Sequence, residues 1–388
     1  MTGRRVLLVE PWLAGSHEAW ARGWQAASRH EIQLLAHEGR AWRWRMRGAS
    51  VTLAASAERW VAEHGRPDLV VGTDMLDLAA FLGAARRSLG SVPAALYLHE
   101  NQLTYPRRPG EALDQGLAWT TWRSLAVADA VWCNSAFHRD DLLGALPAFL
   151  AGVADHDHGD RFAEVAGRCS VLPVGVDLAA VATPTGAARP APPDGPLVLS
   201  NQRWHHDKDL GAVLRALVRL ADRGVAFRVA VVGDDRGGER DALVPLVERL
   251  GNRVVAVGML PRSEYLALLH RADIVVSAAR NEFFGIAVVE AIAAGAVPVL
   301  PDRLAYPEVV PARFHEHVLA EVLPQEATLV LNGELVLNAP LPVAAVEVDL
   351  VVLQAEEAHR LDERRELVSV VAQEVTDQAV GQLRDLVV

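Results

Sequence analysis

Lysine is almost absent from this chain of 388 residues: Lys208 is the only one, although lysine and arginine together number 38. Cysteine is also rare, and Cys133 and Cys169 alone favour a reduced compartment over a disulfide scaffold. The N-terminal apolar run Val6–Val9 ends at Glu10, so it is too short for a signal peptide or a membrane span. We therefore expect a cytoplasmic protein that makes no membrane contact.

The bulk composition is that of a globular protein with two domains. About half of the residues are apolar (51%) and 22% are charged, which excludes disorder over most of the chain. A length of 388 residues exceeds one ordinary core. The net charge of −11 disfavours a protein that coats nucleic acid without specificity, but it still allows a local basic patch.

Short apolar runs alternate with stretches of helical length, a pattern typical of βαβ units and a parallel sheet. In the first half we expect strands at Val6–Glu10, Ile32–Ala36, Leu69–Gly72, Ala94–Leu98, Ala130–Asn134 and Val171–Val174, and helices near Ala19–Ser28, Leu76–Arg87, Trp119–Val127 and Phe137–Leu143. In the second half we expect strands at Leu197–Ser200, Phe227–Val232, Val254–Val257, Ile274–Ser277 and Val297–Leu300, and helices that begin near Leu210, Arg240 and Gly285. The predicted fold class is therefore α/β.

A stretch rich in Ala, Pro, Thr and Gly, from Asp177 to Pro196, separates the two halves and is typical of a linker. We place one Rossmann-like domain at residues 1–178, the linker at 179–196 and a second Rossmann-like domain at 197–388. From about residue 316 the tail is atypical, with a hairpin expected at Ala327–Leu337 around Asn332-Gly333 and a charged helix at Ala355–Val388. Ligands of such sheets lie beyond the carboxyl ends of the strands, so we expect a cleft enzyme.

Two glutamates are placed to hold an extended polyhydroxyl ligand. Glu282 lies in a loop after the strand Ile274–Ser277, and Glu290 lies about one turn inside the next helix. Carboxylates accept hydrogen bonds from hydroxyls, and a helix N-terminus offers free N–H groups to phosphate. Phe284 and Gly285 lie between them, and the glycine permits close approach of a ligand. The alternative is a solvated loop acid and a helix-surface acid.

Arg203 and Lys208 follow the first strand of the second half. A planar guanidinium and a mobile ammonium can together neutralise a leaving nucleoside diphosphate without a metal. The chain has arginine and not lysine at every comparable position except this one, which indicates a specific role for Lys208. The simpler alternative is an ordinary surface lysine at the start of a helix.

Polar residues also follow two strands of the first half, where they would lie at the carboxyl edge of the sheet. The residues after the strand Ala94–Leu98 are His99, Glu100, Asn101 and Gln102, with Tyr105 shortly beyond. Gly15 and Ser16 follow the first strand, and their N–H groups could approach a diphosphate. A structural histidine and a plain βα turn are the alternatives.

Arginines alternate with tryptophans in one segment of the first half. They are Arg40, Trp42, Arg43, Trp44, Arg45 and Arg47. Arginine meets phosphates and aromatic rings stack on splayed bases, so the pattern suits a single-stranded RNA loop. Nine of the ten tryptophans precede residue 135. The alternative is an amphipathic segment that packs its tryptophans on the sheet.

These motifs together resemble a known family. The segment Glu282–Glu290 resembles the E-x7-E element of retaining GT-B glycosyltransferases of the GT4 type, and the likeness continues through Ala293–Val299. The run His99–Pro106 is close to the hallmark of the tRNA-queuosine mannosyltransferases. Further matches are Glu10-Pro11-Trp12, Gly15-Ser16-His17, Trp42–Met46, Thr73–Asp77, Asn134-Ser135, Phe137–Arg139 and Leu172–Asp177, so the resemblance covers about residues 5–310.

The resemblance implies a GT-B fold whose two parallel sheets face an interdomain cleft, and the transfer of mannose from GDP-mannose to the cyclopentenediol of queuosine in tRNA, with retention. It implies that Glu282 contacts the donor sugar and Glu290 the ribose, that Arg203 and Lys208 stabilise departing GDP, and that His99 orients a hydroxyl. The implied donor site combines residues of the C-terminal domain with the turn after the first strand of the N-terminal domain. Its residues are Gly15, Ser16, Arg203, Lys208, Glu282, Phe284, Gly285 and Glu290. The implied acceptor site, in the N-terminal domain, comprises His17, Trp42, Arg43, Arg45, Glu100, Asn101, Gln102 and Tyr105.

Two alternatives stay open at this point. One is another GT4-type enzyme that acts on a lipid, a glycan or a small molecule, and the other is a tRNA-binding protein without activity. No spacing of carboxylates, histidines or cysteines suggests a metal, so we expect no cofactor besides the donor. No residue is seen to recognise guanine, and the sequence does not set the oligomeric state.

Overall fold

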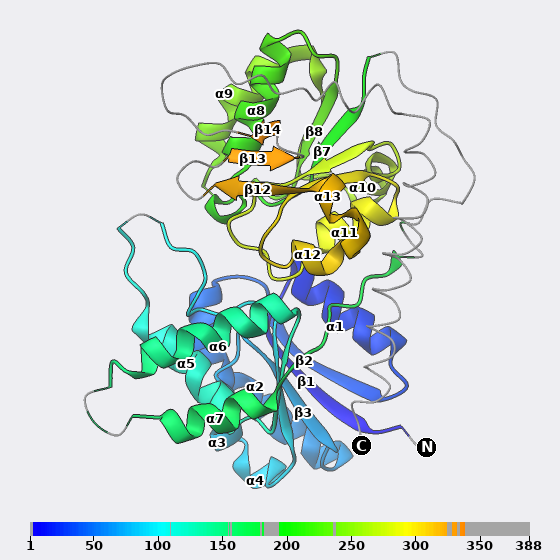
Figure 1. Cartoon of the computed structure of the whole chain (residues 1–388). Coiled ribbons are helices and arrows are strands. Elements are labelled where there is room, and N and C mark those ends of the chain that lie inside the picture. Colours follow the sequence, from blue (N-terminus) through cyan, green and yellow to red (C-terminus); the bar gives the residue numbers. More distant parts are fainter. Residues whose placement is uncertain are drawn as a thin grey trace. The chain divides into compact units, whose positions relative to one another are not determined.

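The computed structural model describes residues 3–108, 110–153, 155, 157–178, 181, 194–235, 238–323, 328–331 and 334–337. The described residues form two compact units, one up to Gly175 and one from Val176 onward (Figure 1). Most of the predicted linker and the whole predicted helix Ala355–Val388 lie outside the described residues. Within the described part of the chain, no helix is both long and apolar enough to cross a membrane.

The first unit contains one sheet of six parallel strands in the order β2-β1-β3-β4-β5-β6. The strands are β1 (Arg5–Leu13), β2 (Glu31–Glu38), β3 (Leu69–Thr73), β4 (Ala94–Leu98), β5 (Ala130–Cys133) and β6 (Cys169–Val171). The chain adds β2 on one side of β1 and all later strands on the other side. The carboxyl ends of β1 and β3 therefore form the switch point, where sheets of this kind bind their ligands.

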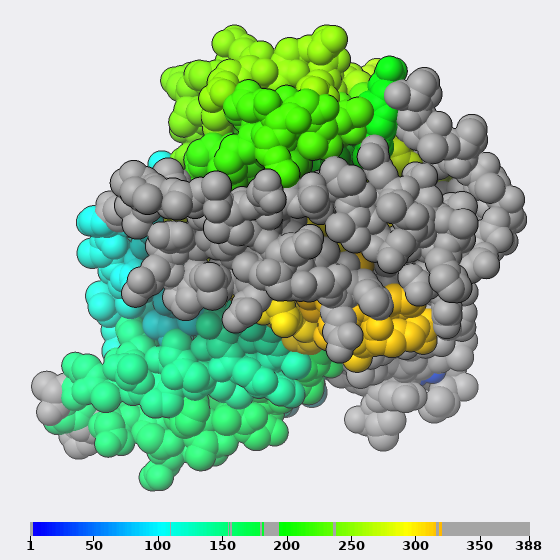
Figure 2. All heavy atoms as spheres, turned by 45° about the horizontal axis from the view of Figure 1, so that its top comes forward, coloured from blue at the N-terminus to red at the C-terminus, as the bar shows by residue number. Residues whose placement is uncertain are grey.

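Seven helices accompany this sheet in the described residues. They are α1 (Gly15–Ala27), α2 (Trp42–His64), α3 (Leu78–Ala84), α4 (Arg86–Leu89), α5 (Gln115–Val127), α6 (Ala136–Leu150) and α7 (Gly159–Arg168). The apolar core joins the strands to α2, α3, α5 and α6, with Trp122 and Phe81 among its largest buried side chains. Figure 2 shows that the segment from α5 to α7, coloured cyan to green, is exposed at the surface.

The second unit contains one sheet in the order β14-β13-β12-β11-β10-β7-β8-β9. The strands are β7 (Leu197–Ser200), β8 (Arg228–Val232), β9 (Val254–Gly258), β10 (Ile274–Val276), β11 (Val297–Pro301), β12 (Leu319–Leu323), β13 (Thr328–Leu331) and β14 (Glu334–Leu337). The strands from β12 to β9 are parallel, and β12-β13-β14 is antiparallel. Because β8 and β10 lie on opposite sides of β7, the switch point is at the carboxyl ends of β7 and β10.

The helices of the second unit in the described residues are α8 (Leu210–Asp222), α9 (Arg240–Leu250), α10 (Arg262–Leu269), α11 (Ile286–Ala293), α12 (Tyr306–Val309) and α13 (His315–Val318). Helix α8 forms because its apolar residues recur at helical spacing, and Leu210, Val213, Leu214 and Leu217 are all buried. The same core includes Trp204, which is 0% exposed.

Most predicted elements are present, but one strand is shifted and several elements were missed. The last strand of the first half is Cys169–Val171, not Val171–Val174, because Pro173 lacks the N–H that a strand needs. The segment that begins at Trp42 is the start of a helix of 23 residues, which was not predicted. Helices α7 and α10 and strand β12 were not predicted either. The predicted hairpin near the end is present as the antiparallel pair β13-β14, while its turn residues lie outside the described residues.

Candidate functional site

The predicted polar constellations of both units lie at the carboxyl edges of their sheets. In the second unit, Lys208 follows β7 and Glu282 follows β10, and these two strands are hydrogen-bonded neighbours. This placement brings together residues that are 74 positions apart in the sequence. The prediction that the two constellations of the second half act together therefore has a structural basis.

Lys208 is buried, with 8% of its surface exposed, and points its ammonium at oxygen atoms. Its Nζ donates to the carbonyl oxygen of Asn281 at 2.5 Å and to Glu282 Oε2 at 3.1 Å. It also lies 3.3 Å from Asp207 Oδ2. A buried ammonium between two carboxylates is held in place by charge as well as by hydrogen bonds. Lys208 is thus no ordinary surface lysine, contrary to the simpler of the two interpretations.

Asp207 anchors the segment after β7. Burial alone would raise the pKa of its carboxyl, but the hydrogen bond of His205 and the charges of Lys208 and Arg203 hold that pKa well below its usual value. The backbone oxygen of Asp207 also accepts the N–H of Arg280 at 2.7 Å. The Arg203 side chain is exposed, in contrast to Lys208. The two predicted cations therefore differ, since one is fixed in the interior and one is at the surface.

The Glu282 side chain is partly buried and lies beside a glycine with left-handed backbone. Glu282 Oε1 accepts the N–H of Phe284 at 3.4 Å, and Phe284 is 6% exposed. Gly285 has φ +94° at the N-terminus of α11, a conformation that other residues adopt only with strain. A Cβ at Gly285 would lie 3.5 Å from Glu282 Cγ and 3.6 Å from Tyr306 Cε1. The predicted close approach thus coincides with a glycine that the backbone requires.

Glu290 is bound by two residues that the sequence did not indicate. Its Oε1 accepts from Arg262 Nη2 at 2.7 Å, and its Oε2 accepts from the Tyr265 hydroxyl at 3.0 Å. The same hydroxyl accepts from Asn201 Nδ2 at 2.9 Å, which links Glu290 to the residue after β7. Glu290 is 9% exposed, so it is not the helix-surface acid of the alternative interpretation. A carboxylate has acceptor capacity beyond these two hydrogen bonds, so Glu290 can still accept from a ligand hydroxyl.

In the first unit, Glu10 and His17 form a buried ion pair. His17 Nδ1 lies 3.0 Å from Glu10 Oε2, and the side chains are 5% and 0% exposed. Burial alone would lower the pKa of His17, but the charge and hydrogen bond of Glu10, with the charges of Asp74 and Glu100, raise that pKa to about 9. His17 is therefore an imidazolium at neutral pH. The sequence analysis predicts it only as a contact to the acceptor substrate.

His99 lies against His17 with the two ring centroids 4.0 Å apart. The rings of Trp20 and Tyr97 meet it edge-on at 4.8 and 4.9 Å. Burial, together with the positive charges of His17 and His138, holds the pKa of His99 well below 6.5. A neutral, orientated imidazole next to a charged one suits the predicted role of His99 in orienting a hydroxyl.

The other predicted residues of this edge differ in what they can offer. Asn101 is 1% exposed, and its Oδ1 accepts the N–H groups of Leu103 and Thr104 at 3.0 and 2.9 Å, so it shapes the loop. Glu100 Oε1 accepts from Gln102 Nε2 at 2.9 Å. The remaining predicted residues here are Tyr105, which is half-buried, and Gly15 and Ser16, which are exposed at the N-terminus of α1, where Gly15 has φ +54°.

The arginines at the start of α2 are largely paired with acids. Arg43 lies 3.2 Å from Glu111, Arg47 lies 2.7 Å from Asp114, and Arg40 pairs with Glu38. Trp42 packs against Met46 in a small core, whereas Trp44 is 67% exposed. Arg45 donates to the Glu38 carbonyl at 3.3 Å. The segment thus combines both interpretations, because one tryptophan packs inward and the other faces solvent.

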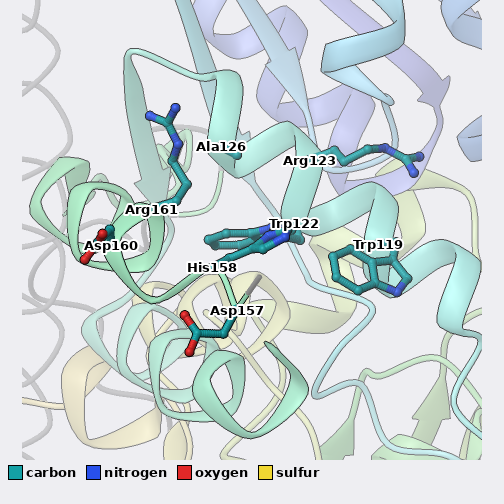
Figure 3. A pocket seen from close by; sticks show the side chains of 8 residues that line it. All are labelled: Trp119, Trp122, Arg123, Ala126, Asp157, His158, Asp160 and Arg161. Atoms are coloured by element: carbon teal, nitrogen blue, oxygen red, sulfur yellow. Dashed lines mark hydrogen bonds between the residues drawn. The ribbon is translucent and has the colours of Figure 1, made fainter. Parts of the chain in front are cut away.

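A pocket of about 600 Å³ lies between α5 and α7, and none of the predicted site residues lines it. Figure 3 shows the rings of Trp119 and Trp122 in it, with Arg123 and Arg161 at its border. Trp122 Nε1 donates to His158 Nδ1 at 2.7 Å, so its polar atom is satisfied within the protein. This pocket is a feature of helix packing at the surface of the first unit.

Two groups in the described residues bring together side chains that could hold a metal ion, namely Glu10-His17-His99 and His205-His206-Asp207. In the first group the glutamate and one histidine bind each other, and in the second His205 binds Asp207. The expectation that no metal is needed stays a prediction.

Two protein families match the sequence. Residues 5–176 match the tRNA-queuosine alpha-mannosyltransferase N-terminal family, and residues 186–328 match the glycosyl transferases group 1 family. A tRNA-queuosine alpha-mannosyltransferase of Drosophila melanogaster is 29% identical over 312 residues, which are 79% of this chain and 81% of that protein. The predicted resemblance is confirmed, and the chain is a glycosyltransferase.

A second relative matches a shorter part of the chain, and its name includes the sugar donor that it uses. A GDP-mannose:cellobiosyl-diphosphopolyprenol alpha-mannosyltransferase of Xanthomonas oryzae pv. oryzae is 36% identical over 148 residues, which are 37% of this chain and 38% of that protein.

Solved structures of low sequence identity share the fold. Sucrose-phosphate synthase from Thermosynechococcus elongatus has a TM-score of 0.64 at 15% identity, with 99% of each chain covered. Anabaena HepE in complex with UDP and glucose has a TM-score of 0.61 at 15% identity, with 99% of this chain and 98% of that chain covered. The predicted α/β class, with two parallel sheets as in GT-B glycosyltransferases, is confirmed.

Proposed function

We propose that this chain, a glycosyltransferase that joins a tRNA-queuosine alpha-mannosyltransferase N-terminal domain to a group 1 glycosyltransferase domain, transfers mannose from GDP-mannose to the cyclopentenediol of queuosine in tRNA. The observation that carries the proposal is the buried Lys208–Glu282 pair in the second domain, with Nζ and Oε2 3.1 Å apart. The first domain, which matches the tRNA-queuosine alpha-mannosyltransferase N-terminal family, supports the acceptor. Work on tRNA would place the protein in the cytoplasm.

The second domain is proposed to hold the donor. Lys208 and Arg203 would bind the diphosphate and stabilise GDP as it leaves, because cations offset the charge that develops on the leaving oxygen. Glu282 would accept hydrogen bonds from mannose hydroxyls, and Glu290, held by Arg262, would accept those of the ribose. In the same step the acceptor hydroxyl attacks the anomeric carbon on the face that the diphosphate leaves, the bond to the diphosphate breaks, and the hydroxyl proton passes to the departing diphosphate oxygen. We propose that the anomeric configuration is retained.

The donor proposal has one support outside the site. The Xanthomonas relative named as a GDP-mannose enzyme and the Drosophila relative named as a mannosyltransferase agree on the sugar. The direct test incubates the protein with radiolabelled GDP-mannose and with tRNA that contains or lacks queuosine. Label that appears only on queuosine tRNA is the expected result. GDP release with label on neither tRNA would contradict the proposed acceptor.

A lipid-linked acceptor is the second candidate, and the partial match to the diphosphopolyprenol enzyme favours it. Treatment of the labelled product with ribonuclease separates the two candidates. Label that survives ribonuclease and partitions into organic solvent would identify a lipid acceptor, whereas label released as small fragments would identify tRNA.

We further propose that the reaction needs no metal ion, because Lys208 and Arg203 already supply positive charge in the second domain. Excess EDTA is expected to leave kcat/KM of the transfer unchanged. The control is EDTA saturated beforehand with Mg²⁺. A loss of activity that Mg²⁺ or Zn²⁺ restores would contradict the prediction and direct attention to the His205-His206-Asp207 group.

The exposed ring of Trp44 is expected to contribute to tRNA binding. Trp44→Ala should weaken the affinity for queuosine tRNA by about tenfold, since stacking on one base is worth roughly 1–3 kcal/mol. The affinity for GDP-mannose should not change. Val51→Ala is the matched control, because Val51 lies on the same helix and is equally exposed at 67%. Wild-type affinity of the Trp44 variant for tRNA would assign this face a different role.

A further inference from the structure

Asp74 lies directly after β3, at the switch point of the first sheet, and is 7% exposed. Its Oδ1 accepts the backbone N–H of His99 at 2.9 Å, which ties the ends of β3 and β4 together. Its Oδ2 is fully buried and has no hydrogen-bond partner among the described residues. Buried polar atoms without partners are rare in folded proteins, so this oxygen calls for an explanation.

A second such atom belongs to the residue that Asp74 contacts. His99 Nε2 is also buried and without a hydrogen-bond partner in the described part of the chain. The His99 ring is fixed by contacts with His17, Trp20 and Tyr97. His99 is therefore fixed twice, because these contacts hold its ring and Asp74 binds its backbone N–H. Both atoms are thus held at the edge where a ligand of this sheet binds.

The charges around Asp74 decide what could fill the place. Glu10 lies on β1 and Glu100 lies just after β4, and both carboxylates oppose a further anion. His17 on α1 is already bound to Glu10 at 3.0 Å. A phosphate is therefore disfavoured beside Asp74. A hydroxyl group fits, because it can donate to a carboxylate oxygen and also form a hydrogen bond with an imidazole nitrogen.

We propose that Asp74 binds the acceptor: its Oδ2 accepts a hydrogen bond from a hydroxyl of the acceptor diol, and His99 Nε2 is the second polar group of the same subsite. This inference rests on the proposed function and adds a residue to it. It assigns to Asp74 the choice of a hydroxyl-bearing acceptor, because a base without the diol would leave both buried atoms unpaired.

Asp74→Asn tests the proposal directly, because the hydrogen bond from the His99 backbone N–H fixes the orientation of the new asparagine side-chain amide. The amide oxygen must take the Oδ1 position to accept that N–H, which leaves the NH₂ group at the Oδ2 position. The variant thus keeps the bond between β3 and β4 and converts one acceptor into a donor. Asp129→Asn is the matched control, since Asp129 Oδ2 accepts the N–H of Ala94 at 2.8 Å at the opposite end of β4.

The expected result is a decrease of kcat/KM for queuosine tRNA of about 10- to 100-fold in Asp74→Asn, the effect of one charge-assisted hydrogen bond. The Kd for GDP-mannose should stay at the wild-type value, and Asp129→Asn should behave as wild type. Wild-type kcat/KM in Asp74→Asn would overturn the proposal. An increase of the GDP-mannose Kd instead would assign the hydroxyl to the donor sugar and overturn the acceptor assignment.

A pH profile separates direct contact from a structural role. Burial, with the charges of Glu100 and Glu10, raises the pKa of Asp74 to about 7 against the attraction of His17 and the His99 N–H. Only the ionised carboxylate is a pure acceptor, so kcat/KM for the tRNA should rise with pH through about 7. This rise should be absent from Asp74→Asn. An identical rise in the variant would show that another group causes it and would contradict the proposal.

A binding experiment keeps this inference distinct from the proposed function. Saturation-transfer NMR with cis-cyclopentane-1,2-diol should show contact with the wild-type protein and none with Asp74→Asn. If the wild type binds the diol through Asp74 but labels no queuosine tRNA, the proposed function fails and the hydroxyl subsite stands. If the wild type does not bind the diol, or if the variant binds it equally well, the subsite is overturned and the two atoms bind only water.

Discussion

Lys208→Ala is expected to lower kcat/KM of the transfer by about 10²- to 10³-fold, the usual effect of removing one charge that stabilises a transition state. The structure makes this cation more than a contact to the diphosphate. Lys208 Nζ also binds Glu282 Oε2 at 3.1 Å and lies 3.3 Å from Asp207 Oδ2. Without it, the carboxylate proposed to hold the mannose loses its partner, and Asp207 becomes a buried anion with less compensation.

The measurement is kcat/KM at several GDP-mannose concentrations, with thermal unfolding recorded for each variant. Lys208→Met is the second variant, because it keeps the length of the side chain and fills the same space. Arg249→Ala is the matched control, since Arg249 pairs with Asp222 at 2.9 Å on the surface and both side chains are about 60% exposed. Folded Lys208 variants with kcat/KM close to that of Arg249→Ala would remove Lys208 from the mechanism.

The strands could be predicted because they are short continuous runs of β-branched and aliphatic residues, the pattern typical of strands buried on both faces of a parallel sheet. Helix α2 could not, although its buried residues recur at helical spacing. These residues are Met46, Ala49, Ser50, Leu53, Ala54, Ala57 and Trp60. Alanine and serine make up much of this buried stripe, so its hydropathy is low and the arginine–tryptophan alternation at its start dominated the interpretation.

The two constellations of the second domain could be predicted because both follow strands, and parallel strands end at the same edge. The partners of Glu290 could not. Arg262 and Tyr265 precede it by 28 and 25 residues and reach it from α10, a contact that no spacing in the sequence encodes. Asp74 is a different case. It follows β3 as His99 follows β4, so the rule that indicated His99 applies to it equally.

Each domain has a buried cation that pairs with carboxylates near the switch point of its sheet, but the number of carboxylates differs. In the second domain one cation, Lys208, lies between Asp207 and Glu282. In the first domain one imidazolium, His17, is held by Glu10. A bound diphosphate would compete with the carboxylates of Asp207 and Glu282 for Lys208, which is 8% exposed. His17 is enclosed with its partner, so its charge contributes to the stability of the fold.

Glu10→Gln is expected to lower the free energy of unfolding of the first domain by about 3 kcal/mol at pH 7, the usual result of breaking a buried ion pair. The pKa of His17 is about 9 in the folded protein against an ordinary value of 6.5. Its charge therefore stabilises the fold fully below pH 6.5, and this contribution is lost as pH rises through about 9. Glutamine keeps the shape of the side chain but cannot attract the proton.

The difference between wild type and Glu10→Gln should therefore be largest near pH 6 and nearly vanish by about pH 10. Urea unfolding followed by tryptophan fluorescence measures it, since nine of the ten tryptophans precede residue 135. Glu18→Gln is the matched control, because Glu18 pairs with Arg22 at 3.0 Å on the exposed side of α1 and should matter by less than about 0.5 kcal/mol. A difference that is equally large at both ends of the pH range would show that Glu10 stabilises the domain through packing or its bond to the Trp12 N–H, and not through the charge of His17.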